Sequence, residues 1–487
     1  MAIVSKEEFL REYSTALLED RAAAFVGAGF SVGAGFVDWK TLLREVAADL
    51  GLLVDEEHDL IALAQYEVNR SGTRDRLEQK VIREFVSKGT ITPSHGWLAR
   101  LPLQTVWTTN YDDLLEKAFK DANKVVDVKF TTNHLQHRVP YTDVVIYKMH
   151  GDVSDPASAV LTKDDYEQYD KEHPLFVQQL QAGLASCMFL FVGFSFTDPN
   201  IESIFVRLRH LLGRNAKSLK RHYCMLRRPD RADKEFTDQA KFDRAVKRFD
   251  HRVADLQRFG VQVVAIDAFA EVEAILAQVS RAVNTRSVMI SGAAYDYAPL
   301  GKDRVEVLSR KLGQALVRNS YSIVSGFGLG ISGAMIIGSH EEVARLRQGR
   351  VGQRLRLYPF PFDQANSAAK DAAYEAIRNE MAAQSGATVF ICGNKQNPAG
   401  PGTIISPGVM KELDKALANN HILVPIGCTG HAAKEIWDLV TADPKKYFGD
   451  VDVHSELRIL GDSSATDDAI VGAVLAVLDK CRKGVSK

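Results

Sequence analysis

Short apolar runs alternate with helical stretches along almost the whole chain. Many of these runs end in glycine, serine, threonine or asparagine, and a helical pattern follows before the next run begins. The runs of the first half cover residues 22–29, 103–110, 143–152, 188–195, 221–226 and 259–267, and those of the second half cover 287–294, 321–330, 354–361, 387–394 and 421–430. This alternation is typical of strand–helix units with mostly parallel sheets. The sequence therefore predicts an α/β protein with two doubly wound, Rossmann-like domains.

The two sets of runs also predict where the domains begin and end. The 487-residue chain is long enough for two large domains. A helical segment that ends near Asn284 separates the two sets, so we expect one domain over residues 1–284 and another over residues 285–487. Between the first two runs, residues from about 40 to 100 show helical patterns and no good strand. We expect this region to form a helical insertion in the first domain.

Charge and cysteine usage narrow the function classes. The net charge is −1 at pH 7, so no overall field would attract nucleic acid or an anionic membrane. No stretch approaches the roughly 20 apolar residues of a transmembrane helix, and residues 1–20 have the pattern of an amphipathic helix, not of a signal peptide. The five cysteines form no C-x-x-C pair, which argues against a disulfide framework and a zinc ribbon. We therefore expect a cytoplasmic protein without a bound metal, and neither nucleic acid nor a membrane as a partner.

The first apolar run leads into a glycine-rich loop, in the stretch FVGAGFSVGAGFVDW over residues 25–39. Gly27 and Gly29 follow the predicted strand directly, and Ser31 comes next. Glycine lets the backbone approach a phosphate closely and adopt positive φ. The spacing differs from both the dinucleotide-binding G-x-G-x-x-G pattern and the P-loop pattern. By itself the loop is equally consistent with an ordinary turn and with a pyrophosphate site.

Two further strand ends carry a neutral amide and an imidazole. In VWTTNYDDLLEKAF (106–119), Asn110 ends an apolar run, and an acidic helical pattern follows at once. Asparagine is a favoured helix N-cap, so a capping role competes here with a catalytic one. In KMHGD (148–152), His150 ends another strand-like run, where it is either structural or a base that titrates near neutral pH.

Taken in order, four motifs resemble the signature of the sirtuin (Sir2) family. They are GAGFSVGAGFVDW (27–39), TTNYD (108–112), KMHGD (148–152) and VGFSFTDPN (192–200). The resemblance implies cleavage of the bond between nicotinamide and ribose in NAD+, with Asn110 and His150 as catalytic residues and His150 as the general base. The residues that it implies as NAD+ contacts are Gly27, Ala28, Gly29, Ser31, Asp38, Asp112, Gly193 and Ser195. On this interpretation Asn110 is a catalytic residue that also starts a helix.

The sequence departs from the sirtuin pattern in ways that affect which molecule accepts the ribosyl group. Sirtuin deacylases complete their acyl-lysine cleft with a zinc ribbon, and this chain has no four-cysteine set. Val37, Trp39 and Thr109 stand where sirtuins have proline, phenylalanine and glutamine. Without a peptide cleft, water is the simplest acceptor for the ribosyl group. We therefore expect an NAD+ glycohydrolase that releases nicotinamide and ADP-ribose, with no prosthetic group and no zinc.

The second half resembles the SLOG family, whose members bind nucleotide derivatives. The resemblance rests on MISGAA (289–294), IVSGFGLGISGAMIIGS (323–339), ICGNK (391–395) and PGTIISPGVMKEL (401–413). The related phosphoribohydrolases carry a catalytic glutamate where this chain has Ser406, which favours ligand sensing over hydrolysis. The residues that the resemblance implies as ligand contacts are Ser291, Gly292, Gly326, Phe327, Gly328, Leu329, Arg378, Lys395 and Glu412. Arg378 and Lys395 would pair with phosphates, and Glu412 with a ribose hydroxyl.

A Sir2-like domain followed by a SLOG domain resembles the effectors of Thoeris anti-phage defence systems. That resemblance implies a cyclic ADP-ribose isomer, made by a TIR-domain partner protein, as the activating ligand. It also implies a homo-oligomer, expected as a tetramer, whose NAD+ depletion stops phage growth. Three alternatives stay open: a silent Sir2-like sensor of NAD+ or ADP-ribose, a protein deacylase without zinc, and a nucleotide phosphoribohydrolase in the second half.

Overall fold

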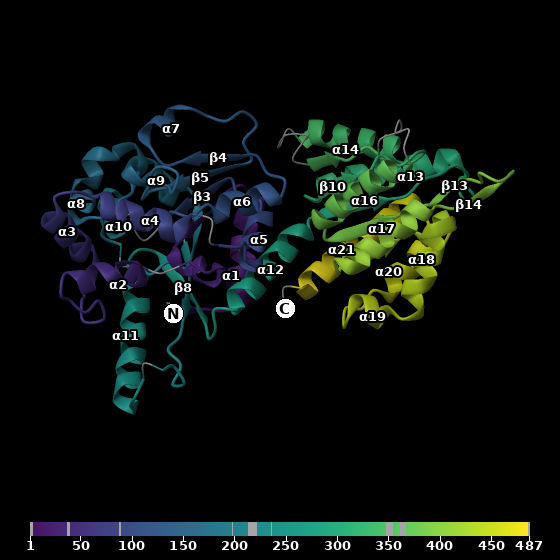
Figure 1. The fold of residues 1–487 in the computed structure, drawn as a ribbon. Coiled ribbons are helices and arrows are strands. Elements are labelled where there is room, and N and C mark those ends of the chain that lie inside the picture. The colour runs from purple at the N-terminus through teal and green to yellow at the C-terminus, as the bar shows by residue number, and fades with distance from the viewer. Residues whose placement is uncertain are drawn as a thin grey trace. The chain divides into compact units, whose positions relative to one another are not determined.

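The chain folds into two compact units, drawn in Figure 1. A computed structural model describes residues 3–36, 39–86, 89–196, 198–212, 222–234, 236–346, 354–360 and 367–485. The units are Met1–Ser280 and Arg281–Lys487. Each contains a parallel sheet with helices between its strands. The predicted α/β class with two doubly wound domains is confirmed.

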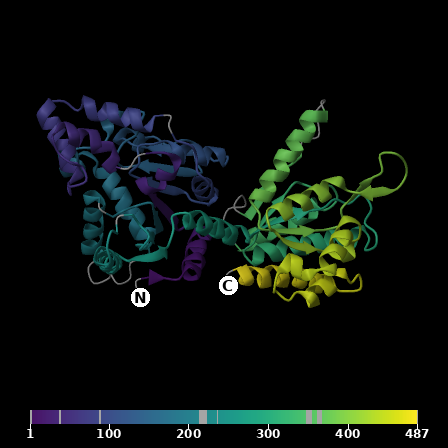
Figure 2. The ribbon, with the colours of Figure 1, turned by 60° about the horizontal axis from the view of Figure 1, so that its bottom comes forward.

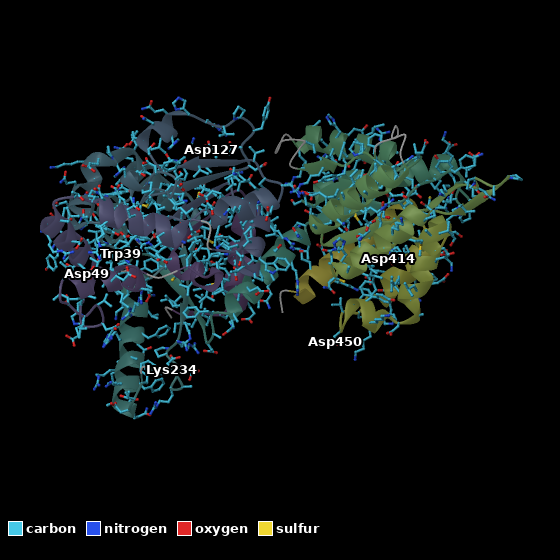
Figure 3. All side chains as sticks on the ribbon, in the orientation of Figure 1. Trp39, Asp49, Asp127, Lys234, Asp414 and Asp450 are labelled. Carbon is cyan, nitrogen blue, oxygen red and sulfur yellow. The ribbon has the colours of Figure 1, made fainter. Side chains whose placement is uncertain are left out.

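Among the residues that the structure describes, the first unit has a parallel sheet of eight strands. In sheet order they are β1 (Ile3–Val4), β8 (Val261–Ile266), β7 (His222–Arg227), β6 (Met188–Val192), β2 (Ala22–Val26), β3 (Thr105–Thr108), β5 (Val144–Lys148) and β4 (Val126–Lys129). Every residue of β2 is buried, as expected for an apolar strand that is covered on both faces. The sequence pattern did not predict β1, which is very short, or β4. β4 carries Asp127, labelled in Figure 3, and Lys129, and their ion pair is buried.

The helices of the first unit connect these strands. They are α1 (Lys6–Leu18), α2 (Trp39–Asp49), α3 (Leu60–Ser71), α4 (Asp75–Phe85), α5 (Pro93–Arg100), α6 (Leu114–Asp121), α7 (Thr132–Gln136), α8 (Lys163–Glu172), α9 (Pro174–Ser186), α10 (Pro199–Leu212) and α11 (Gln239–Gln257). α12 (Glu271–Asn284) follows β8, and the boundary between the two units falls within it. α2 to α5 all lie between β2 and β3 in the chain, and α2, α3 and α4 bury Leu43, Leu63 and Val81 in a hydrophobic cluster that also includes Tyr111, Leu114 and Leu161. Trp39, labelled in Figure 3, begins α2 and packs against this cluster.

The chain order creates a switch point in this sheet. β3, β5 and β4 lie on one side of β2, whereas β6, β7, β8 and β1 lie on the other side. The direction of winding therefore reverses between β2 and β6. Parallel strands present their carboxyl ends at one edge, and ligands of open α/β sheets bind beyond that edge at the switch point. The fold thus places the candidate site beside the loops that follow β2 and β6.

The second unit contains, within its described residues, a parallel five-stranded sheet and an antiparallel hairpin. In sheet order the strands are β11 (Leu355–Leu357), β10 (Ser322–Ser325), β9 (Ser287–Ser291), β12 (Ala387–Phe390) and β15 (Ile422–Pro425), and the hairpin is β13 (Asn394–Gln396) with β14 (Thr403–Ile405). The helices are α13 (Lys302–Arg318), α14 (Ser332–Leu346), α16 (Ser367–Ala383), α17 (Pro407–Ala418), α18 (His431–Ala442), α19 (Pro444–Phe448), α20 (His454–Gly461) and α21 (Asp467–Val485). Figure 2 shows the hairpin extending away from the body of this unit. The switch point lies between β9 and β12.

In the described ranges of both units, no helix is long and apolar enough to cross a membrane.

Candidate functional site

Two loops that contain glycine cross at the switch point of the first unit. Gly27 donates its N–H to the carbonyl oxygen of Val192 at 3.0 Å, and Gly29 donates to that of Gly193 at 2.9 Å. A Cβ on Gly27 would lie 2.5 Å from the Gly193 oxygen, and a Cβ on Gly193 would lie 2.3 Å from the Phe30 nitrogen. Gly193 also has a φ of +63°. Glycine is therefore required where the loops cross, and a ligand can approach the backbone closely there.

Alanine at position 193 is expected to destabilise the first unit. The added methyl group would meet the backbone of Phe30, and overpacking of this kind costs about 1–3 kcal/mol. Gly72→Ala is the matched control, because Gly72 has a φ of +74° and a Cβ there would have no atom within 4 Å. Urea unfolding of the two variants measures the difference in free energy of unfolding. An equal decrease in the free energy of unfolding in both variants would contradict a steric role for Gly193.

The Asn110 side chain lies beside the first of these loops. Its Nδ2 donates to Ser31 Oγ at 3.1 Å and to the Gly27 carbonyl oxygen at 3.3 Å. The prediction that Asn110 starts a helix is wrong, since α6 begins at Leu114 and its N-cap is Asp113. The physical reason is that the amide finds its partners in the glycine loop instead of in the first turn of α6. The capping interpretation of Asn110 is thereby excluded.

His150 follows the neighbouring strand β5 and is buried. Tyr166 and Tyr169 of α8 approach its ring edge-on, with ring centroids 5.3 and 6.2 Å away. Its Nε2 lies 3.3 Å from a carboxylate oxygen of Asp198, the residue before α10, without meeting hydrogen-bond geometry. Burial lowers the pKa of His150, and the charge of Asp198 opposes this only in part. The imidazole is therefore neutral at pH 7, the form that can accept a proton.

Asn110 and His150 occupy equivalent places at the edge of the sheet. Thr108 and Lys148 are register partners on β3 and β5, and each candidate residue comes two positions later in the chain. Within the described part of the chain, Asn110 Oδ1 and His150 Nε2 are buried and have no hydrogen-bond partner. Leaving a buried polar atom unsatisfied costs about 1–3 kcal/mol. Two such atoms at one strand edge indicate groups that a ligand satisfies.

A buried ion cluster supports the loop between β3 and α6. Lys148 is fully buried and pairs with Glu116 at 2.9 Å and with Asp152. It also donates to the carbonyl oxygens of Tyr111 and Asp112, at 3.1 and 2.6 Å. Burial alone would lower the pKa of Lys148, and the two carboxylates together raise it above its usual value. The charged lysine therefore holds the loop that carries the candidate amide.

The other residues predicted to contact NAD+ lie around the same loops. Ser31 and Asp112 are buried, and burial raises the pKa of the Asp112 carboxyl. Ala28 and Ser195 are exposed, the first in a short 3-10 helix after β2 and the second after β6. Asp38 lies outside the described residues.

Asp198 and Lys148 were not singled out from the sequence, although both lie inside quoted motifs. A lysine inside the apolar run VVIYK was a usable signal, because a charge in a buried strand needs a partner. Nothing in the sequence pairs Asp198 with His150. Across the described ranges, no three His, Cys, Asp or Glu side chains are grouped so that they could hold a metal ion.

A second candidate site lies at the carboxyl edge of the five-stranded sheet. Ser291 ends β9 and donates to Glu412 of α17 at 2.5 Å, with both side chains buried. The Arg378 guanidinium of α16 lies 4.0 Å from Glu412. Its centre is 5.2 and 5.7 Å from the ring centroids of Phe360 and Tyr374. Burial raises the pKa of Glu412, while Ser291 and Arg378 act in the opposite direction. Arg378 Nε is buried and has no hydrogen-bond partner among the described residues.

Glycines also shape this second site. A Cβ on Gly328 would lie 2.0 Å from the Gly292 carbonyl oxygen, so the loops after β9 and β10 cross without room for a side chain. A Cβ on Gly326 would lie 2.5 Å from the Phe360 ring. The predicted contacts that are exposed are Phe327, Leu329 and Lys395, the last on β13. The predicted set thus surrounds the ends of β9 and β10, with two helices and the hairpin contributing.

Two family models match the chain. A SIR2-like domain model matches residues 104–247, and the model of the Sir2- and TIR-associating SLOG family matches residues 271–481. The resemblance to the Sir2 and SLOG families is confirmed. The fold and its two loop systems define a protein in which a SIR2-like part precedes a SLOG part.

Curated relatives match almost the whole chain. A protein from Bacillus cereus (strain MSX-D12), named NAD(+) hydrolase ThsA, is 37% identical over 449 residues, which cover 92% of each chain. A protein of the same name from Acinetobacter baumannii (strain 532279) is 38% identical over 436 residues, 89% of each chain. Defense-associated sirtuin 2 of Bacillus subtilis is 25% identical over 215 residues, 42% of this chain and 21% of that protein. The chain belongs to the ThsA family.

Proposed function

We propose that this protein is an NAD+ glycohydrolase and that its reaction centre lies where β3 and β5 end. The observation that supports this most strongly is the pair of buried atoms without partners, Asn110 Oδ1 and His150 Nε2, beside a glycine loop shaped for close backbone approach. The relatives named NAD(+) hydrolase support the same substrate. A neutral amide and a neutral imidazole suit a substrate whose leaving group is already cationic.

The proposed reaction breaks the bond between ribose C1′ and the pyridine nitrogen of NAD+. The bonding electron pair goes to that nitrogen, so nicotinamide leaves as a neutral molecule and the ribose passes through an oxocarbenium-like state. A water molecule attacks C1′, and its proton passes to His150, which later releases it to solvent. Asn110 can orient the water or a ribose hydroxyl without adding charge. The products are nicotinamide, ADP-ribose and one proton.

Nicotinamide release from NAD+ is the direct test of this function. We expect the purified full-length protein to form nicotinamide and ADP-ribose in equal amounts with no peptide present. Formation of nicotinamide only with an acylated peptide would identify a deacylase. Binding of NAD+ without turnover, with or without the candidate activators below, would identify a sensor.

The SLOG part, in this proposal, senses a cyclic ADP-ribose isomer made by a TIR-domain protein, and its binding activates NAD+ hydrolysis in defence against phage. Such a messenger carries two phosphate charges, and Arg378 and Lys395 would neutralise them. Glu412 would accept a hydrogen bond from a ribose hydroxyl. The name of the matched SLOG family, which associates it with Sir2 and TIR proteins, supports this assignment. A tetramer as the active assembly rests on the resemblance alone, and light scattering measures its mass.

Removing either positive charge is expected to weaken messenger binding. A hydrogen bond to a charged group contributes about 1.5–3 kcal/mol, so Arg378→Gln and Lys395→Met should each raise the dissociation constant about 10- to 150-fold. Lys411→Met is the matched control, because Lys411 is an exposed lysine of α17. Calorimetry with each candidate cyclic ADP-ribose isomer measures the affinity, and NAD+ consumption measures activation. Unchanged affinity in both charge-removing variants would refute this placement.

A further inference from the structure

Asp198 reaches the imidazole of His150 from the opposite side of the switch point. Its Oδ2 lies 3.3 Å from His150 Nε2, and both side chains are largely buried. Its Oδ1 accepts the backbone N–H groups of Asn200 and Ile201, at 3.0 and 3.2 Å, at the start of α10. One carboxylate oxygen is therefore fixed by the helix start while the other faces the ring.

The remaining groups around His150 do not substitute for this carboxylate. Asp165 of α8 also acts on the imidazole, with a smaller effect than Asp198. Its carboxylate is already bound by Arg74 at 2.5 Å and by two backbone N–H groups. Tyr166 and Tyr169 are neutral, since burial, with a contribution from the charge of Asp198, raises their pKa values. His173, which follows α8, is also kept neutral because burial lowers its pKa.

We propose that Asp198 is the positioning residue of His150: its carboxylate, which lies 3.3 Å from Nε2 without a hydrogen bond to it, stabilises by its charge the protonated ring that forms when water gives up its proton. A carboxylate that orients a catalytic histidine and stabilises the imidazolium is a general device of acid–base catalysis. The contact between Asp198 and His150 joins the segment after β6 to the segment after β5. The kinetic part of this proposal rests on the proposed NAD+ cleavage, and the part that concerns the imidazole does not.

The test removes the charge of Asp198 and keeps its helix cap. Asparagine caps helices as well as aspartate does, so Asp198→Asn should leave the start of α10 intact. Asp238→Asn is the matched control, because Asp238 caps α11 through the N–H of Lys241 at 2.7 Å and is not among the charges that act on His150. Deuterium exchange at the C2 carbon of His150, followed by mass spectrometry over a range of pH, reports the pKa of this imidazole without any turnover.

Loss of the carboxylate should lower the pKa of His150 further, since an opposite charge within 4–6 Å favours the charged form of the imidazole. The control should leave this pKa where it is. If His150 has the same pKa in Asp198→Asn as in the native protein, the proposal is overturned.

Kinetics provide the second readout, with NAD+ as substrate and the activating cyclic ADP-ribose isomer present. Neutral His150 is the active form, so kcat/KM falls as the pH drops through its pKa. Asp198→Asn should move this acidic limb to lower pH and reduce the plateau about 10- to 100-fold, whereas Asp198→Glu should keep the limb near its native position. An equal loss at every pH, with no movement of the limb, would show a merely structural role and overturn the proposal. Should the native protein cleave no NAD+, the proposed function fails, while deuterium exchange still decides the role of Asp198.

Discussion

Alanine in place of Asn110 or His150 should nearly abolish NAD+ cleavage in the activated protein. Removing a positioned hydrogen-bonding group from a reaction centre costs about 10²–10³-fold in turnover, and removing a general base costs about 10²–10⁴-fold. The expectation follows from two buried atoms that lack partners among the described residues, Asn110 Oδ1 and His150 Nε2, which lie at equivalent places just beyond the ends of β3 and β5. Nicotinamide release at saturating NAD+ measures the effect on kcat.

Two controls separate chemistry from folding in this experiment. Asn69→Ala removes an amide that bonds Gln65 on the exposed face of α3, and should keep full activity. Thermal unfolding of each variant should show that the first unit stays folded at the assay temperature. Full activity in either Asn110→Ala or His150→Ala would rule out the proposed reaction centre.

Replacement of Lys148 by methionine should destabilise the first unit by about 3–5 kcal/mol, the usual cost of breaking a buried ion pair. The change would leave Glu116 and Asp152 buried without their cation. It would also leave the carbonyl oxygens of Tyr111 and Asp112 without a donor. Urea unfolding, with a probe in the first unit, measures the loss. Activity should fall as well, because the loop that Lys148 holds carries the candidate amide.

A surface ion pair offers the matched control for Lys148. Lys117 pairs with Asp113 at 2.8 Å with both side chains about half exposed, and such pairs contribute about 0.3–0.5 kcal/mol. Lys117→Met should therefore have little effect. Neutralising the carboxylates together with the lysine, as Glu116→Gln and Asp152→Asn in the methionine variant, should recover part of the stability. A loss no greater than that of Lys117→Met would contradict the supporting role of Lys148.

Local patterns were enough to predict the fold class and the loops of the candidate site. Apolar runs that end in small residues and alternate with helical patterns act within a few residues, and they predicted the two parallel sheets. The glycines at 27 and 193 were visible because close backbone approach excludes a side chain. The pattern did not predict β4, because the charged residues Asp127 and Lys129 interrupt its apolar run. Their opposite charges balance each other only when the folded protein brings them together as an ion pair.

The role of Asn110 shows how far local chemistry can mislead. An asparagine followed by acidic residues satisfies every local rule for a helix start. In the folded protein the amide bonds the glycine loop and α6 begins four residues later, at Leu114. The glycine loop lies far away in the chain, so no local rule could have chosen between the two partners.

By itself, the sequence determined the order of strands and helices, the glycines that the loops require, and the motifs that resemble sirtuins, because each of these depends on neighbouring residues. The tertiary structure alone decided which distant groups meet: Asp198 with His150, and Lys148 with Glu116. The physical reason is that burial and charge pairing depend on strand order and register. The folded loops bring together side chains whose contact cannot be predicted from their separation in the sequence.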